Sequence, residues 1–484
     1  MHIPHIQLAT DLHISPLLNG LWQIADMERD GKVIDLDKAA AAMQTYLDRG
    51  LSTFDMADHY GSAEIISGLF REQLLDPSSI QLLTKWVPEP GPSSKEKVRR
   101  AIERSLERLK SSQLDLLQYH AWNYADPAYL DDLFYLNELR QEGMITHLGL
   151  TNFDSAHLNL VLETGIPIVS NQICYSLLDQ RAASSMTAVC HKHGVKLLAF
   201  GTMAGGFFSD RWVNKADPGI HNGLTWSQMK YRRFIEESGG WGSFQQLLHV
   251  LQELAHKHGV SIPQVASAYI LRQAAVAGVI VGVRLGQDRY LDDNVSILQV
   301  DLDNEDLEKI QHQLATQMSI PGDCGDEYRK PPFLTASGDL SHHLDAFPPP
   351  YPVVQVSQNR SKVLSGTIWE ELAGFSRATR IGNRILISGT TSTHGHRCIG
   401  GKDPAAQAHF ILDKIAGTLH SFGASMKEVI RTRIYIQRME DWEVIAKVHG
   451  DRFRDIQPAN TMIRADLIGE EYLLEIEAEA EMPV

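Results

Sequence analysis

Four side chains able to take part in proton transfer stand just after short apolar runs near the start of the chain. Asp55 ends the run at 53–55, and Tyr60 follows five residues later in a polar turn, while Lys85 and His120 each close another such run. The carboxyl ends of parallel barrel strands meet on one face, so strands of this kind would place all four around one pocket. Such a set could deliver a proton to a carbonyl oxygen.

Each residue type has a chemical reason to be there. A tyrosine with a pKa of about 10 is a poor acid at neutral pH, but an adjacent ammonium such as Lys85 stabilises the phenolate and lowers that pKa. Asp55 would hold Lys85 protonated and oriented. His120 would donate a hydrogen bond to the substrate oxygen and fix the carbonyl against a hydride donor. A single strand-end Asp or His is more often structural, so the hypothesis depends on the four together.

Alternating apolar runs and amphipathic segments predict an α/β fold, a (β/α)8 barrel, for the first two thirds of the chain. The expected strands lie at 19–23, 53–55, 80–84, 114–119, 145–150, 168–172, 195–200 and 276–283, and expected helices at 37–49, 127–142, 154–164, 182–193 and 261–273. Residues 208–245 form a long insertion rich in Trp, Gly and charge. We expect it to be a loop that shapes substrate specificity or acts as a mobile surface lid.

This part of the chain resembles the aldo-keto reductase family over about residues 6–310. The matching motifs are DMADHYG at 55–61, TKW at 84–86, SLERLKSSQLDLLQYH at 105–120, GLTNF at 149–153 and NQICYS at 171–176. The resemblance implies a (β/α)8 barrel and a nicotinamide cofactor bound without a Rossmann fold. It also implies a catalytic tetrad, which here is Asp55, Tyr60, Lys85 and His120.

The same resemblance indicates where the cofactor would lie. Thr151, Asn152 and Gln172 match the positions that hold the nicotinamide carboxamide, and Phe200 stands where the family commonly has a stacking tyrosine. The glycines after Phe200 could let backbone amides approach a pyrophosphate. Trp22 either lines the pocket or packs against the barrel wall. The other expected cofactor contacts are Gly20, Gly201, Gly205, Arg284, Gln287, Asp293 and Asn294.

The choice between NADP(H) and NAD(H) depends on the last barrel strand. Arg284 follows that strand and would suit a 2′-phosphate, which favours NADP(H). Many NADP-using members carry a second arginine where this chain has Tyr290, with Arg289 adjacent. NAD(H) therefore remains open.

Length and composition predict two domains. With 484 residues and 43% hydrophobic content, the chain suits a barrel at 1–320, a proline-rich linker at 321–365 and a second domain at 366–484. The first part of the linker is a candidate to lie over the barrel mouth. The second domain is expected to have strands at 380–390, 429–437 and 472–479 and helices at 405–422 and 439–453.

The second domain resembles the Rid/YjgF-like family over about residues 368–482, a smaller α+β fold of the chorismate-mutase-like type. The matching segments are GFSRATRIGNRILISGT at 374–390, RTRIYIQRMEDWEVIAKVHGDRF at 431–453, QPANTMIRADL at 457–467 and LLEIEAEA at 473–480. That family forms trimers with ligand clefts between subunits, which implies a homotrimer here. Its active members hydrolyse enamines and imines.

One departure weakens the expectation of that activity. The active members have an arginine directly after the Pro-Ala pair, where it clamps the substrate carboxylate, and this chain has Asn460. Glu475 is retained, and Phe375 and Ser388 could still line a cleft. The sequence therefore favours trimer formation or ligand capture over classical deaminase activity.

Net charge and cysteine spacing limit the classes of partner and ligand that we expect. Lys+Arg 45 against Asp+Glu 60 gives a net charge of −15, which argues against a nucleic-acid or anionic-membrane partner. No signal segment or membrane span is evident, so a cytoplasmic protein is expected. The four cysteines show no paired spacing, and the run at 394–398 has no second ligand cluster, so neither a disulfide framework nor a metal is expected.

The resemblance predicts an NADPH-dependent reductase of a small carbonyl substrate. Two other hypotheses remain. The fusion could be a bifunctional enzyme of an imine or enamine pathway, or the barrel could be a nicotinamide-binding sensor or assembly module on a trimeric hub.

Overall fold

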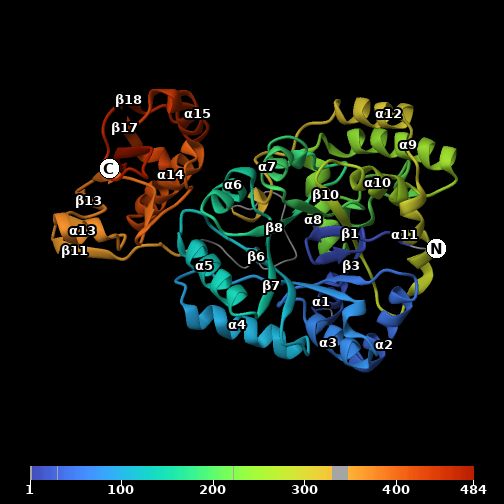
Figure 1. Cartoon of the computed structure of the whole chain (residues 1–484). Helices are drawn as coiled ribbons and strands as arrows, with labels where there is room; N and C mark the ends of the chain where they lie inside the picture. Colours follow the sequence, from blue (N-terminus) through green and yellow to red (C-terminus); the bar gives the residue numbers. More distant parts are fainter. Residues whose placement is uncertain (1–2, 30, 222, 330–346, 484) are drawn as a thin grey trace.

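The computed structural model describes residues 3–29, 31–221, 223–329 and 347–483 (Figure 1). A closed eight-stranded parallel barrel occupies the N-terminal part, and a separate, smaller α+β domain follows it, which confirms the predicted fold class. The proline pair at 331–332 and the segment 341–343 of the expected linker lie outside the described residues.

The barrel strands follow one another around the ring in the order β10, β3, β4, β5, β6, β7, β8 and β9. Their bounds are β3 Leu17–Gly20, β4 Thr53–Asp55, β5 Gln81–Trp86, β6 Leu114–His120, β7 Ile145–Thr151, β8 Ile168–Cys174, β9 Lys196–Phe200 and β10 Val276–Gly282. Both faces of such strands are buried, which is why they read as nearly continuous apolar runs in the sequence.

Helices surround the barrel on the outside (Figure 1). Their bounds are α2 Leu36–Leu47, α3 Ala63–Gln73, α4 Lys95–Arg108, α5 Ala128–Gln141, α6 Ser155–Glu163, α7 Ser185–His193, α9 Gly240–His258, α10 Ile262–Leu271 and α12 Asn304–Leu314, with the shorter α1 Trp22–Arg29 and α11 Leu291–Ser296. An unpredicted hairpin, β1 Ile6–Ala9 and β2 Leu12–Ile14, packs Leu8, Leu12 and Ile14 against barrel-lining residues such as Leu83 and Leu116.

The insertion at 208–245 is not simply a loop. It contains α8, Trp226–Glu237, and the first turns of α9. Thr225 caps α8 in a capping box with Gln228, because each side chain bonds the backbone N–H of the other residue. The Trp and Gly content of this stretch hid that start signal. The segment expected to be a specificity loop therefore carries a helix beside the barrel mouth.

The C-terminal domain is a seven-stranded sheet with two long helices, α14 Pro404–Ser421 and α15 Trp442–Phe453. The strands lie in the order β11 Val353–Ser357, β12 Arg360–Val363, β13 Ala378–Ile381, β14 Arg384–Thr390, β19 Leu474–Glu481, β17 Val429–Ile436 and β18 Ala459–Arg464. The sheet's buried side chains, such as Ile387 and Ile434, pack with Ile411 and Ile415 of α14 in one core. A short helix, α13 Ile368–Ala373, and a small hairpin, β15 Thr393–His394 with β16 Arg397–Cys398, complete the domain.

Two strands of this sheet lie where the linker was expected. β11 and β12 form an antiparallel pair at the edge of the sheet, and β12 also pairs with β13. The sheet thus begins at Val353 rather than after residue 365. The run of prolines at 348–352 obscured the strand that follows it, because β11 is an edge strand and lacks a strong alternation of buried side chains.

The two domains are in direct contact through α6 of the barrel and α14. Phe410 and Ala406 of α14 belong to the same buried cluster as the barrel core. Polar contacts add to this packing: His394 Nε2 lies 2.8 Å from Asp131 Oδ1, and the backbone N–H of Gly400 donates to Thr164 Oγ1 at 3.0 Å. α14 is therefore buried on both sides, against its own sheet and against the barrel.

Candidate active site

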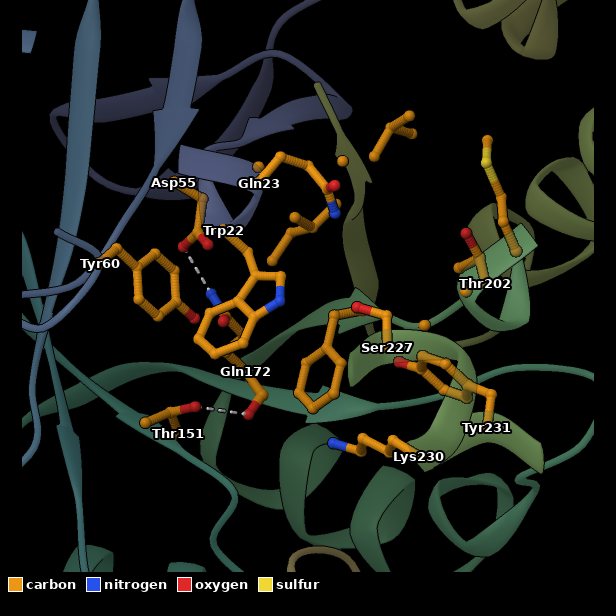
Figure 2. Close-up of a pocket in the computed structure, with 18 of the residues that line it drawn as sticks. Trp22, Gln23, Asp55, Tyr60, Thr151, Gln172, Thr202, Ser227, Lys230 and Tyr231 are labelled. Atoms are coloured by element: carbon orange, nitrogen blue, oxygen red, sulfur yellow. Dashed lines mark hydrogen bonds between the residues drawn. The ribbon is translucent and has the colours of Figure 1, made fainter. Parts of the chain in front are cut away.

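A cavity of about 560 Å³ opens at the carboxyl ends of the barrel strands. Asp55 ends β4, Tyr60 stands in the turn after it, Lys85 lies on β5 and His120 ends β6, and all four line this cavity. Figure 2 shows Asp55 and Tyr60 on one side of the pocket, across from Lys230 and Tyr231 of α8. The strand geometry brings together the four side chains that the sequence placed at successive strand ends.

Lys85 and Asp55 form a buried ion pair. Lys85 Nζ donates to Asp55 Oδ2 at 2.7 Å and Oδ1 at 2.9 Å, and to the backbone carbonyl of Met56 at 2.6 Å. Burial lowers the pKa of Lys85, while the charge of Asp55 acts in the opposite direction. Lys85 Nζ lies 5.1 Å from the centre of the Tyr60 ring. The ammonium is thus placed to stabilise a phenolate on Tyr60.

His120 is a buried, neutral imidazole. Burial, followed by the nearby charge of Arg329, holds its pKa well below the usual range. Its Nδ1 lies 3.4 Å from the Thr151 carbonyl oxygen, and its buried Nε2 has no hydrogen-bond partner among the described residues. The carbonyl oxygen can only accept, so this long contact is a hydrogen bond when the ring proton is on Nδ1. Nε2 faces a ligand as an acceptor in that tautomer and as a donor when the proton is on Nε2.

Two amides support Asp55 from the floor formed by the neighbouring strands. Gln172 Nε2 donates to Asp55 Oδ1 at 2.7 Å and to Gln118 Oε1 at 2.9 Å, and Gln118 Nε2 donates to Asp55 Oδ1 at 3.2 Å. All three side chains are buried. The amide nitrogen of Gln172, expected to face a nicotinamide, is thus engaged by Asp55. Sequence reasoning missed Gln118, which gives no signal because it sits inside an apolar strand.

Most residues expected to contact a cofactor also line the cavity. They are Gly20, Trp22, Thr151, Asn152, Gln172, Phe200, Gly201, Gly205 and Arg284. The Trp22 ring meets the Tyr60 ring edge to face, with ring centres 4.9 Å apart. Trp22 therefore lines the pocket, which is the first of the two positions that the sequence left open. Gln287, Asp293 and Asn294 lie on the exposed turn after β10 and on α11, outside this lining.

The comparison with known proteins assigns both parts of the chain. Residues 16–314 match the family described as the aldo/keto reductase family, and residues 368–482 match the family described as endoribonuclease L-PSP, to which Rid proteins belong. The first match covers more than half of the 484 residues. The chain belongs to the aldo/keto reductase family.

Curated relatives agree with this assignment. This aldo/keto reductase is 25% identical to "Pyridoxal reductase, chloroplastic" of Arabidopsis thaliana, over 64% of this chain and 85% of that protein. It is 29% identical to "Protein tas" of Escherichia coli, over 45% of this chain and 67% of that protein. It is 28% identical to "Aflatoxin B1 aldehyde reductase member 2" of Rattus norvegicus, over 49% of this chain and 67% of that protein. The aldo/keto reductase is therefore an NAD(P)H-dependent oxidoreductase.

The cavity of this aldo/keto reductase fits a nicotinamide cofactor. Asn152 Oδ1 is buried without a hydrogen-bond partner among the described residues, as an acceptor for a carboxamide would be. Gly201 and Gly205 have positive φ, and a Cβ on Gly201 would lie 2.4 Å from the Tyr231 hydroxyl. Glycine is needed here both for backbone conformation and for the close approach of α8.

Two pocket residues of the aldo/keto reductase lie far from the family motifs. Lys230 lies on α8, and Tyr328 lies at the end of the short 3-10 helix Asp326–Tyr328. The Tyr328 ring lies 5.7 Å from the His120 ring, so the first part of the expected linker does reach the barrel mouth. The sequence offered no signal for either side chain, because each is brought in by a segment outside the barrel repeat.

Not all of the residues expected to line a cleft in the C-terminal domain lie close to one another within a single subunit. Ser388 on β14 and Glu475 on β19 are on adjacent strands, and a Cβ on Gly389 would lie 1.8 Å from Glu475 Oε1. Asn460 is on the edge strand β18, with β17 between it and β19, and it donates to Thr432 Oγ1 at 2.9 Å. Phe375 lies near the buried Arg377, whose guanidinium is 5.7 Å from its ring centre.

Two further observations concern a metal ion and a membrane as possible partners. Among the described residues, no three His, Cys, Asp or Glu side chains are grouped so that they could hold a metal ion. In the run at 394–398, His394 instead faces Asp131 of the barrel. No helix in the described ranges is long and apolar enough to span a bilayer.

Proposed function

We propose that the protein is an NADPH-dependent reductase of small carbonyl compounds. The observation that carries this proposal is the convergence of Asp55, Tyr60, Lys85 and His120 on one cavity, with an unpartnered Nε2 on His120. When bound, the reduced nicotinamide would supply the hydride that turns the carbonyl into an alcohol.

The chain's own residues would orient the carbonyl and supply the proton. His120 Nε2–H would donate a hydrogen bond to the carbonyl oxygen and hold it in place. Tyr60 would transfer its phenolic proton to that oxygen as the alcohol forms. Lys85, 5.1 Å from the Tyr60 ring centre, would stabilise the resulting phenolate, and Asp55 would keep Lys85 charged and oriented.

Arg284 supports the preference for NADPH. It lines the cavity two residues after the end of β10 and is exposed, and within the described ranges its hydrogen-bond partner is Gln23 Oε1, at a long distance of 3.4 Å. A guanidinium that is not committed to a carboxylate suits the 2′-phosphate of the cofactor. Trp22 and Phe200 offer aromatic faces to the nicotinamide and the substrate.

The direct test is NADPH oxidation with a panel of small aldehydes, comparing the wild-type protein with Tyr60→Phe. The variant keeps the ring packing against Trp22 and removes only the proton, so we expect turnover to fall by at least about 100-fold. Cofactor affinity, measured by quenching of tryptophan fluorescence, should change little. An undiminished rate in Tyr60→Phe would reject the assignment of Tyr60 as the acid.

For the C-terminal domain we propose assembly into a homotrimer with ligand capture, rather than imine hydrolysis. The support is the sheet face opposite α14, where Leu386 of β14 and Ile463 of β18 are 43% and 49% exposed. Asn460 also cannot make the bidentate charged pair that a carboxylate clamp requires. Comparing the full chain with its Glu475→Gln variant on imine-forming amines would test hydrolysis, and ammonia release that depends on Glu475 would restore the bifunctional alternative.

A further inference from the structure

A second lysine lies in the cavity, and no carboxylate of the described residues forms an ion pair with it. Lys230 of α8 lines the cavity and is only 8% exposed. Its Nζ donates a hydrogen bond to the Tyr328 hydroxyl. Four aromatic rings surround the ammonium, with ring centres 4.6 to 5.9 Å from Nζ; they belong to Phe200, Tyr231, Phe234 and Tyr328. Aromatic faces stabilise a cation but do not neutralise it.

Two buried carboxylates of this region, Asp179 and Glu327, pair with Arg181, and Glu327 Oε1 has no hydrogen-bond partner among the described residues. Arg181 Nη2 lies 2.7 Å from Asp179 Oδ2 and 2.9 Å from Glu327 Oε2. Within the part of the chain that the structure describes, no carboxylate comes within 4.0 Å of Lys230 Nζ, the limit for an ion pair. A buried ammonium with only a phenol and ring faces around it is costly to maintain, and an anion brought into the cavity would reduce that cost.

Lys230 is also close to the group that would hold the carbonyl. The Tyr328 ring, which Lys230 contacts, lies 5.7 Å from the His120 ring, and the Trp122 ring, in one packed cluster with Tyr328, lies 4.5 Å from His120. One aromatic ring thus separates the ammonium from the imidazole. In Figure 2 the Lys230 side chain extends from α8 toward the middle of the pocket. A ligand a few bonds long would reach from His120 to Lys230.

We propose that Lys230 is a specificity-determining residue that binds an anionic group of the substrate, so that the preferred substrates are short aldehydes or ketones carrying a carboxylate or a phosphate. This inference rests on the proposed carbonyl reduction. The carbonyl oxygen would lie at Tyr60 and His120, and the anionic end would lie against Lys230 and the Tyr328 hydroxyl. A charge-assisted hydrogen bond in a buried site is the interaction that distinguishes a charged substrate from a neutral one of similar size.

The test compares kcat/KM for matched substrate pairs in wild type, Lys230→Met and Lys230→Arg. Succinic semialdehyde against butanal tests a carboxylate, and glyceraldehyde 3-phosphate against glyceraldehyde tests a phosphate. We expect the ratio of the anionic to the neutral substrate to fall about 10- to 100-fold in Lys230→Met for the recognised anion, and to recover in large part in Lys230→Arg. Lys215→Met, which removes an exposed lysine from the same insertion, should leave the ratio unchanged.

Two results would overturn the inference. An equal loss for the anionic and neutral members of both pairs would show that Lys230 only supports the fold of the pocket. A weaker affinity for NADPH with an unchanged substrate ratio would place Lys230 on the cofactor instead.

Failure of the proposed reduction itself would look different. If wild type reduces none of the four aldehydes, the reductase proposal fails, and calorimetric titration of the NADP⁺-loaded protein with succinate and with inorganic phosphate still tests Lys230. The affinity of Lys230→Met for at least one of the two anions should then be at least about 10-fold lower than that of wild type. Equal binding of both anions to the two proteins would reject the anion site.

Discussion

His157 of the barrel and Asp413 of the C-terminal domain are joined by a buried hydrogen bond of 2.7 Å between Nε2 and Oδ2. His157 Nδ1 also lies 2.7 Å from Asp154 Oδ1, and the imidazole stacks on the Tyr124 ring at 3.4 Å. Although burial disfavours its charge, the carboxylates of Asp154 and Asp413 raise the pKa of His157 to about 9. An imidazolium therefore connects the two domains at neutral pH.

Replacing His157 should destabilise the protein in a pH-dependent way. The folded-state pKa of about 9 is above the unfolded value of about 6.5, so the stabilisation is fully present below pH 6.5 and is lost as pH rises through 9. We expect His157→Gln to lower the free energy of unfolding by about 2 to 3 kcal/mol at pH 7. Urea denaturation at pH 7 and pH 10 measures it, with the exposed His256→Gln as control. A difference between wild type and His157→Gln that stays constant with pH would contradict the imidazolium.

Removing the charge of Arg329 should raise the pKa of His120. After burial, the Arg329 guanidinium is the next cause that keeps this imidazole neutral. Arg329 Nε donates to the Ala121 carbonyl oxygen at 3.0 Å, directly beside His120 in the chain. NMR titration of the His120 ring protons should show a higher pKa in Arg329→Met and a value close to wild type in Arg329→Lys. An unchanged His120 titration in Arg329→Met would mean that burial alone sets its charge state.

Gln118 should matter for turnover although it does not line the cavity. It donates to Asp55 Oδ1 at 3.2 Å and accepts from Gln172 Nε2 at 2.9 Å. Gln118→Leu removes both bonds in a buried place, which costs on the order of 1 to 3 kcal/mol for the unsatisfied groups. We expect kcat to fall roughly 10-fold because Asp55 and Lys85 lose their fixed orientation. The single-turnover rate with saturating NADPH measures this loss, and a rate equal to wild type would show that Lys85 and Gln172 hold Asp55 without Gln118.

Arg284 should decide between NADPH and NADH. Loss of a guanidinium that pairs with the 2′-phosphate should weaken NADPH binding about 10- to 100-fold and leave NADH binding nearly unchanged. Fluorescence titration of Arg284→Leu with both cofactors measures the ratio. Arg289→Leu is the matched control, since its guanidinium lies 4.5 Å from the centre of the Tyr290 ring. If Arg289→Leu rather than Arg284→Leu loses the preference for NADPH, the 2′-phosphate lies on the turn before α11.

The proposed homotrimer predicts a mass of about three times the 54.1 kDa chain in light scattering after gel filtration. Leu386→Glu and Ile463→Glu place charges on the exposed sheet face opposite α14, where a partner subunit would cover them. Each variant should shift the protein toward the monomer, because burying an unpaired carboxylate is costly. Asp451→Lys, on α15 away from that face, controls for surface charge. A monomeric wild-type protein would leave that face without the proposed partner.

The repeat of the barrel, and the strand ends at which the candidate catalytic side chains stand, follow from local patterns in the chain. Asp55, Lys85 and His120 are each preceded by an apolar run that belongs to one strand, so local pattern is enough to place them at strand ends. The same holds for α14 and β17, whose periodicity is visible in the chain. Tyr60 lies in the turn directly after β4, so the pattern of that strand also predicts its position.

Contacts between segments far apart in the chain do not follow from such local patterns. Lys230 and Tyr328 are 98 positions apart, and His157 and Asp413 are 256 apart, yet each pair is in hydrogen-bond contact. No local period records such a meeting, because it depends on how α8, the segment after α12 and α14 dock onto the finished barrel. Local strand patterns therefore predict where the proposed proton-transfer residues stand. The proposed anion site at Lys230 and the contact between the two domains depend instead on tertiary packing.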